Sequence, residues 1–92
     1  MKEATIHPGQ RKFAASFGGK LTTARSKSGF TQEKLSELSS VGVSTIKRIE
    51  AGRAQPSLYV FYKLMSALTA EQQRALVAGA EQAFQTAQSD AE

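Results

Sequence analysis

The chain has 92 residues and a mass of 9.9 kDa, which is enough for one small domain, and its 40% apolar and 22% charged residues are typical of a globular protein. Its net charge of +4 and isoelectric point near 9.7 favour a polyanionic partner, although a solvated, mildly basic surface would give the same values. The absence of cysteine and the single histidine, His7, exclude disulfide scaffolds, thiolate zinc sites, cysteine nucleophiles and histidine metal clusters.

Helical periodicity recurs along the chain, and no stretch alternates apolar and polar residues for long enough to predict a strand. The first helical stripe is entered near Pro8 and consists of Phe13, Phe17, Leu21, Ala24 and Ser28. Gly18 and Gly19 interrupt it at a cost of about 1 kcal/mol each relative to alanine, so the stripe predicts either one weak helix or two. Gly29 is placed to end it.

Two short helices come next, joined by a turn at residues 39–42. Thr31 is a hydroxyl N-cap for the second helix, and Ala51 and Gly52 end the third. We expect the apolar residues of this pair to face inward; they are Leu35, Leu38, Val41, Ile46 and Ile49. Helices this short are marginal in isolation, so packing against the first and fourth helices must hold them.

The last two helices complete an all-α fold of about five short helices. Ser57 caps the fourth, whose apolar residues recur at helical spacing: Leu58, Phe61, Leu64, Met65 and Leu68. Thr69 and Gln72 are spaced as a capping box for the fifth. Its one-sided stripe is Leu76, Ala80, Ala83, Phe84 and Ala87, which fits packing on its own domain or on a twin subunit, and residues 89–92 are expected to fray.

The outer side of the third helix carries small and basic residues. They are Val43, Ser44, Thr45, Lys47 and Arg48. A helix end that offers small polar residues and then two cations can enter a DNA major groove, which is about 12 Å wide.

Three motifs follow one another between Phe17 and Leu68. They are F-G-x-x-L-x-x-x-R-x-x-x-G-F-T-Q-E-x-L at 17–35, T-I-x-R-I-E-x-G at 45–52 and P-S-L-x-x-x-x-x-L-x-x-A-L at 56–68. In order and spacing they resemble the lambda-repressor/Cro-like helix-turn-helix family, often called Xre. The resemblance implies a compact five-helix lambda-repressor-like DNA-binding domain with its helix-turn-helix at helices two and three. It divides the chain into a partly helical N-terminal extension at 1–16, this domain at 17–68, and a C-terminal helix and tail at 69–92.

The resemblance also implies a role for each matching residue. Gln32 binds a phosphate together with the N-terminus of helix two, where the helix dipole favours an anion. Arg53 contacts the DNA backbone, and an ion pair between Arg25 and Glu50 orients the recognition helix. The base- and phosphate-facing positions are Val43, Ser44, Thr45, Lys47 and Arg48.

The chain departs from the family pattern at the helix-turn-helix itself. Ser36 replaces the usual alanine at the close approach of helices two and three, and Ser40 replaces a glycine often found in the turn. Gly42 stands where the third helix usually has a serine or threonine N-cap, so that helix begins either there or two residues later with Ser44 as its cap.

We therefore expect a cytoplasmic DNA-binding transcriptional regulator, a repressor that binds a partly palindromic operator as a homodimer. The expected dimer interface is Leu76, Ala80, Ala83 and Phe84, because residues 68–92 hold Arg74 against Glu71, Glu81, Asp90 and Glu92 and would be repelled by phosphate. Two alternatives stay open, namely an antitoxin that binds a toxin protein and autoregulates its operon, and a helix-turn-helix module for protein interaction alone.

Other classes of function lack the residues they need. There is no second histidine, no glycine-rich phosphate loop after a strand and no carboxylate pair framed by apolar residues, so we expect no enzyme activity, metal or cofactor. No apolar run approaches the roughly 20 residues that span a bilayer.

Several polar and aromatic residues that these motifs do not specify fit more than one role. The basic residues Arg11, Lys12 and Lys20 fit either a DNA-backbone arm or a solvated helix face. Tyr59 and Tyr62 fit base stacking, a subunit contact or a covered helix edge. His7, beside Pro8, is expected to be a solvated histidine.

Overall fold

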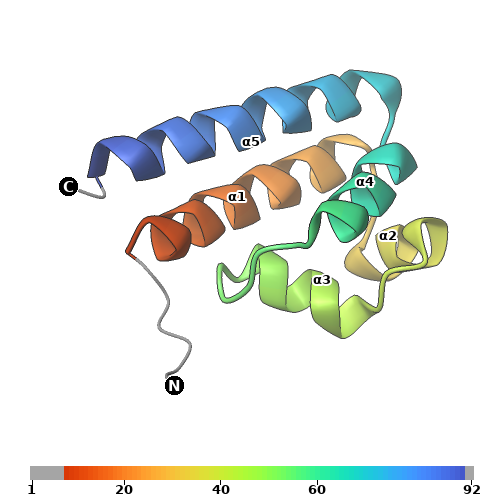
Figure 1. Cartoon of the computed structure of the whole chain (residues 1–92). Helices are drawn as coiled ribbons and strands as arrows, with labels where there is room; N and C mark the ends of the chain where they lie inside the picture. The colour runs from red at the N-terminus through yellow and green to blue at the C-terminus, as the bar shows by residue number, and fades with distance from the viewer. Residues whose placement is uncertain (1–7, 91–92) are drawn as a thin grey trace.

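The computed structural model describes residues 8–90, which fold into five helices and no strand (Figure 1). The helices are α1 (Pro8–Lys27), α2 (Gln32–Ser39), α3 (Val43–Glu50), α4 (Leu58–Ala67) and α5 (Ala70–Asp90). The predicted all-α, five-helix class is confirmed. The expectations for His7, for the rest of residues 1–7 and for Ala91 and Glu92 lie outside the described residues.

The long helix α1 lies in the middle of the molecule. In Figure 1, α5 runs antiparallel to it on one side, and the shorter helices α2, α3 and α4 lie on the other. The largest fully buried side chains come from all five helices: Phe17, Leu21, Leu35, Ile46, Ile49, Leu64 and Leu76. Each such burial is worth about 1.5–3 kcal/mol, so this shared core, and not the intrinsic stability of short helices, holds α2 and α3 in place.

The glycine pair does not break α1, which is continuous from Pro8 to Lys27. Gly18 is buried where α1 crosses the end of α3, whereas Gly19 faces open space. The hydroxyl of Thr22 donates to the Gly18 carbonyl oxygen at 3.0 Å. Tertiary packing therefore outweighs the low helix propensity of the two glycines, and the one-helix alternative is correct.

Two predicted caps are present. The Thr31 hydroxyl accepts a hydrogen bond from the Lys34 amide at 2.9 Å, and the Ser57 hydroxyl accepts one from the Val60 amide at 3.1 Å. The predicted capping box of α5 is wrong, because the Thr69 amide donates to the Ser28 hydroxyl at 3.3 Å and not to Gln72. A contact between the end of α1 and the start of α5 takes its place.

The predicted core is wrong at two leucines. Leu38 is 46% exposed and Leu58 is 73% exposed. Because α2 and α4 have only eight and ten residues, each turns a narrow face to the core, which Leu35 and Leu64 fill. The predicted fraying also begins too early, since α5 remains helical through Asp90.

The predicted dimer stripe of α5 is divided in the structure between two faces. Leu76 and Ala83 are 1% and 0% exposed within the single chain, packed between α5 and α1, so they are unavailable to a second subunit. Ala80 packs partly buried against the core, and Phe84 is 56% exposed. The apolar stripe extends from the face of α5 that packs on α1 to the face that is exposed. The packing on α1 buries Leu76 and Ala83 and leaves Phe84 exposed.

Candidate nucleic-acid interface

The turn between α2 and α3 is held by its own serines. Ser36 donates from its hydroxyl to the Val41 carbonyl oxygen at 2.6 Å, and the Val41 amide donates to the Ser39 hydroxyl at 3.2 Å. Ser40 ends α2 in the left-handed conformation, with a φ of 61° that glycine would adopt more easily. These contacts fix the two short helices relative to each other.

Helix α3 is anchored on one side and open on the other. Ile46 and Ile49 are 0% and 1% exposed, and they seat the helix on the core. Ser44, Lys47 and Arg48 are exposed, while Val43 and Thr45 are half-buried at the edges of the same outward side. We call these five residues (Val43, Ser44, Thr45, Lys47 and Arg48) the outer face of α3. Neither Lys47 nor Arg48 has an acidic partner within residues 8–90.

The helix begins at Val43, with Gly42 as its N-cap and no side-chain cap bond. The later start with Ser44 as the cap is therefore wrong. Because Gly42 has no side chain, no capping hydroxyl occupies the amides of the first turn of α3. Ser44 lies within this first turn and is exposed.

The last residue of α3 is tied to two other helices. The Glu50 carboxylate accepts from Arg25 Nε at 2.7 Å, from a second Arg25 nitrogen at 3.1 Å and from the Gln32 amide at 2.9 Å. Arg25 also donates to the Phe30 carbonyl oxygen at 2.8 Å. The side chains of Arg25 and Glu50 are only 14% and 6% exposed. We call this set the Glu50 network.

The position of Gln32 differs from the simple phosphate-binding role that the resemblance implies. Its amide nitrogen is used by Glu50, so the side chain joins the start of α2 to the end of α3. The Lys34 amide donates to the Thr31 hydroxyl, so the amides of Gln32 and Glu33 are the remaining groups of this turn that could bind an anion, and the helix dipole adds to them.

Arg53 is held directly past the end of α3. The Gly52 amide donates to the Ile49 carbonyl oxygen at 3.0 Å, and the Arg53 amide donates to the Arg48 carbonyl oxygen at 3.0 Å. With a φ of 78° at Gly52, this pattern is a Schellman C-cap, which reverses the chain within two residues. The exposed Arg53 therefore lies beside the end of the helix that carries Lys47 and Arg48.

One residue that positions α3 went unnoticed in the sequence. A Cβ atom on Gly18 would lie 2.9 Å from the Glu50 carbonyl oxygen and closer still to that of Ile49. The backbones of α1 and α3 thus touch at Gly18, where no side chain holds the two helices apart. From the sequence alone, Gly18 is only a residue of low helix propensity, because no neighbouring residue indicates that another helix packs against it.

The arrangement presents a convex helix with small and cationic side chains, flanked by a helix N-terminus and a further cation. Such a surface can enter a groove and neutralise phosphates. Within residues 8–90, no three histidine, cysteine, aspartate or glutamate side chains gather as a metal site, and no helix is long and apolar enough to cross a membrane.

Comparisons with known proteins agree with this geometry. A family model described as a helix-turn-helix domain matches residues 16–77. Among solved structures, the chain is similar to the clp gene regulator ClgR from Corynebacterium glutamicum, with 28% sequence identity and a TM-score of 0.65 over 85% of this chain and 84% of that one. No curated protein matches the sequence.

Proposed function

Because this chain belongs to the helix-turn-helix domain family and is a DNA-binding regulator, not an enzyme, we propose that it is a sequence-specific repressor of the lambda-repressor/Cro (Xre) type. The observation that carries the proposal is the outer face of α3. There Lys47 and Arg48 are exposed and have no acidic partner in the described part of the chain, and the opposite side of the helix is buried. Within the proposal, residues 17–68 form the DNA-binding unit, residues 1–16 extend it, and residues 69–92 serve assembly.

The position of each residue in the structure supports the contact that we propose for it. Ser44 and Thr45, in the first half of α3, read base edges, and Val43 supplies an apolar contact at the entry. Lys47 and Arg48 contact bases or phosphates farther along the groove. The first turn of α2, fixed by Gln32, binds the sugar–phosphate backbone, as does Arg53.

The double substitution Lys47→Ala with Arg48→Ala should weaken DNA binding and leave the fold intact. Each lost phosphate contact lowers the slope of log affinity against log salt by about one per bound subunit, and each lost base contact costs about 1–3 kcal/mol at one base pair. Fluorescence anisotropy with duplex DNA over a range of salt concentrations measures both effects.

The matched control removes two cations far from α3, through Lys27→Ala with Lys20→Ala. Both residues lie on α1 and line a depression between α1 and α5. We expect this variant to bind with nearly the wild-type slope. Equal binding by both double variants and the wild type would remove the outer face of α3 as the DNA-reading surface.

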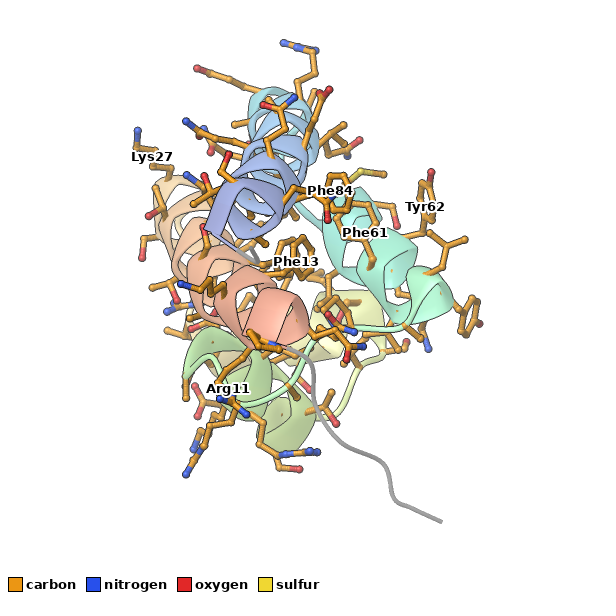
Figure 2. The ribbon with its side chains drawn as sticks, turned by 60° about the vertical axis from the view of Figure 1, so that its left-hand side comes forward. Arg11, Phe13, Lys27, Phe61, Tyr62 and Phe84 are labelled. Atoms are coloured by element: carbon orange, nitrogen blue, oxygen red, sulfur yellow. The ribbon has the colours of Figure 1, made fainter. Side chains whose placement is uncertain are left out.

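We propose further that the regulator is a homodimer, joined through the open side of α4 and α5. Val77 is 48% exposed and Phe84 is 56% exposed, and they lie seven residues apart, on one face of α5. Figure 2 shows Phe84 on the same side of the molecule as Phe61 and Tyr62 of α4. Neighbouring exposed apolar side chains of this size favour a protein contact. A twin subunit would place two copies of α3 on successive half-sites.

The dimer proposal predicts that Val77→Asp with Phe84→Asp gives a folded monomer. The reason is that both side chains are outside the core, so charges there oppose association without disturbing packing. Loss of the second half-site should lower operator affinity by about a hundredfold. Analytical ultracentrifugation reads the oligomeric state.

Two further variants serve as controls for the measurement of the oligomeric state. Leu38→Asp, which charges an exposed leucine on α2, should leave the dimer unchanged. Leu76→Asp should unfold the chain, because its side chain is 1% exposed. A wild type that sediments as a monomer at tens of micromolar rules out this interface.

A further inference from the structure

The first turn of α1 lies beside the loop that follows α3. Gly52 packs so closely on α1 that a Cβ atom there would lie 3.1 Å from Ala15 Cα. Arg11 precedes Ala15 by four residues and therefore lies one turn away on the same face of the helix. Arg53 follows Gly52 directly. Arg11 and Arg53 accordingly border the same shallow depression, together with Gln10, Ala14 and Gln55.

Both arginines are exposed, and neither has a hydrogen-bonding or acidic side-chain partner within residues 8–90. The nearest acid at the end of α3, Glu50, is 6% exposed and already accepts from Arg25 and Gln32. Two like charges are thus held near each other by backbone packing, and no acidic side chain of residues 8–90 pairs with either of them. In Figure 2 the side chain of Arg11 extends from α1 toward the α3 ribbon.

We propose that Arg11 and Arg53 together hold a phosphate group of the DNA backbone beside the C-terminal end of α3. This inference rests on the proposed function and extends its contact surface to the N-terminal turn of α1, outside residues 17–68. The ligand is a phosphodiester, because a guanidinium fork matches phosphate oxygens and because this pair lies beside α3 and not on its outer face. The contact therefore adds affinity for every sequence and discriminates between none.

The same geometry separates Arg11 from another basic residue of α1. The Lys20 ammonium donates to the Gln82 side chain of α5 at 3.1 Å, on the side of α1 opposite α3. A DNA-backbone arm made of the whole basic stripe of α1 is thus wrong with respect to Lys20. Arg11 contributes to DNA binding in this proposal because it lies near Arg53.

The test is the salt dependence of binding by Arg11→Gln to a random-sequence DNA duplex of roughly 30 base pairs, long enough for two half-sites. We expect the slope of log affinity against log salt to fall by about 0.9 per bound subunit, and the affinity at 0.1 M salt to fall roughly fivefold to tenfold per bound subunit. Arg11→Lys should recover most of the slope, since it restores the charge. Thermal melts of both variants should match the wild type, because the side chain is exposed.

Lys27→Gln is the matched control, with the same loss of one charge at the other end of the same helix. Figure 2 shows Lys27 at the end of α1 away from Arg11, and Lys27 lines a depression with Glu71 and Gln72 of α5. An unchanged slope in Arg11→Gln, or an equal change in Lys27→Gln, overturns the inference while the proposed function stands. If the wild type itself shows no salt-dependent binding to the duplex, the proposed function fails, and the inference fails with it.

Discussion

Replacing Glu50 with alanine is expected to lower the free energy of unfolding by about 3–5 kcal/mol. The substitution leaves the Arg25 guanidinium, which is 14% exposed, without its carboxylate, and it also leaves the Gln32 amide without its acceptor. Removing one partner of a buried pair costs more than the pair contributes, because the remaining charge stays desolvated. Urea unfolding followed by circular dichroism gives the value.

Two further variants show that the loss comes from the Glu50 network. Glu37 is an exposed acid 3.6 Å from Lys34, so Glu37→Ala should cost at most about 1 kcal/mol. Arg25→Ala added to Glu50→Ala should recover part of the loss, since the unpaired charge is then gone. If the Glu37→Ala and Glu50→Ala variants were equally stable, the charges of Arg25 and Glu50 would not stabilise each other.

Gly18→Ala is expected to destabilise the fold and to weaken DNA binding, although alanine is the better helix former. The new methyl group would overlap the Ile49 and Glu50 carbonyl oxygens, which are backbone atoms at the end of α3. Overpacking of this kind costs about 1–3 kcal/mol or more, and relieving it requires α3 to move away from α1. The outer face of α3 then shifts relative to α2 and Arg53.

The neighbouring glycine provides the control. A Cβ atom on Gly19 meets nothing within 4 Å, so Gly19→Ala should stabilise the helix by up to about 1 kcal/mol and leave DNA binding unchanged. Thermal melts and duplex binding of the two variants give the comparison. Stabilisation by both substitutions would show that α1 and α3 are not in close contact at Gly18.

Local features of the sequence predicted most of the fold. Thr31 and Ser57 were identified as caps because a hydroxyl followed by a helical pattern satisfies free amides without tertiary help. Ile46 and Ile49 were placed inward by their spacing, and this placement also determined which residues form the outer face of α3.

The sequence could not predict the features that depend on how the other helices pack against α1. The stripe on α5 is apolar on both sides of Ala80, so periodicity alone could not separate the buried Leu76 from the exposed Phe84. Gly18 read as a weak point in a helix because propensity describes the local backbone and not a neighbour 31 residues away in sequence. The nearness of Arg11 to Arg53 likewise arises only when Gly52 packs on Ala15.

The most direct test of whether the outer face of α3 reads DNA is to select bound sequences from random duplex DNA. The selection is done in parallel with the wild type and with the Lys47→Ala, Arg48→Ala double variant. The wild type should enrich a partly palindromic motif with half-sites centred about one helical turn, roughly 34 Å, apart. The variant should lose that enrichment or change it at the positions that Lys47 and Arg48 read. A wild type that enriches no sequence, or a variant that enriches the same motif equally well, would contradict the assignment of the outer face of α3 as the surface that reads DNA.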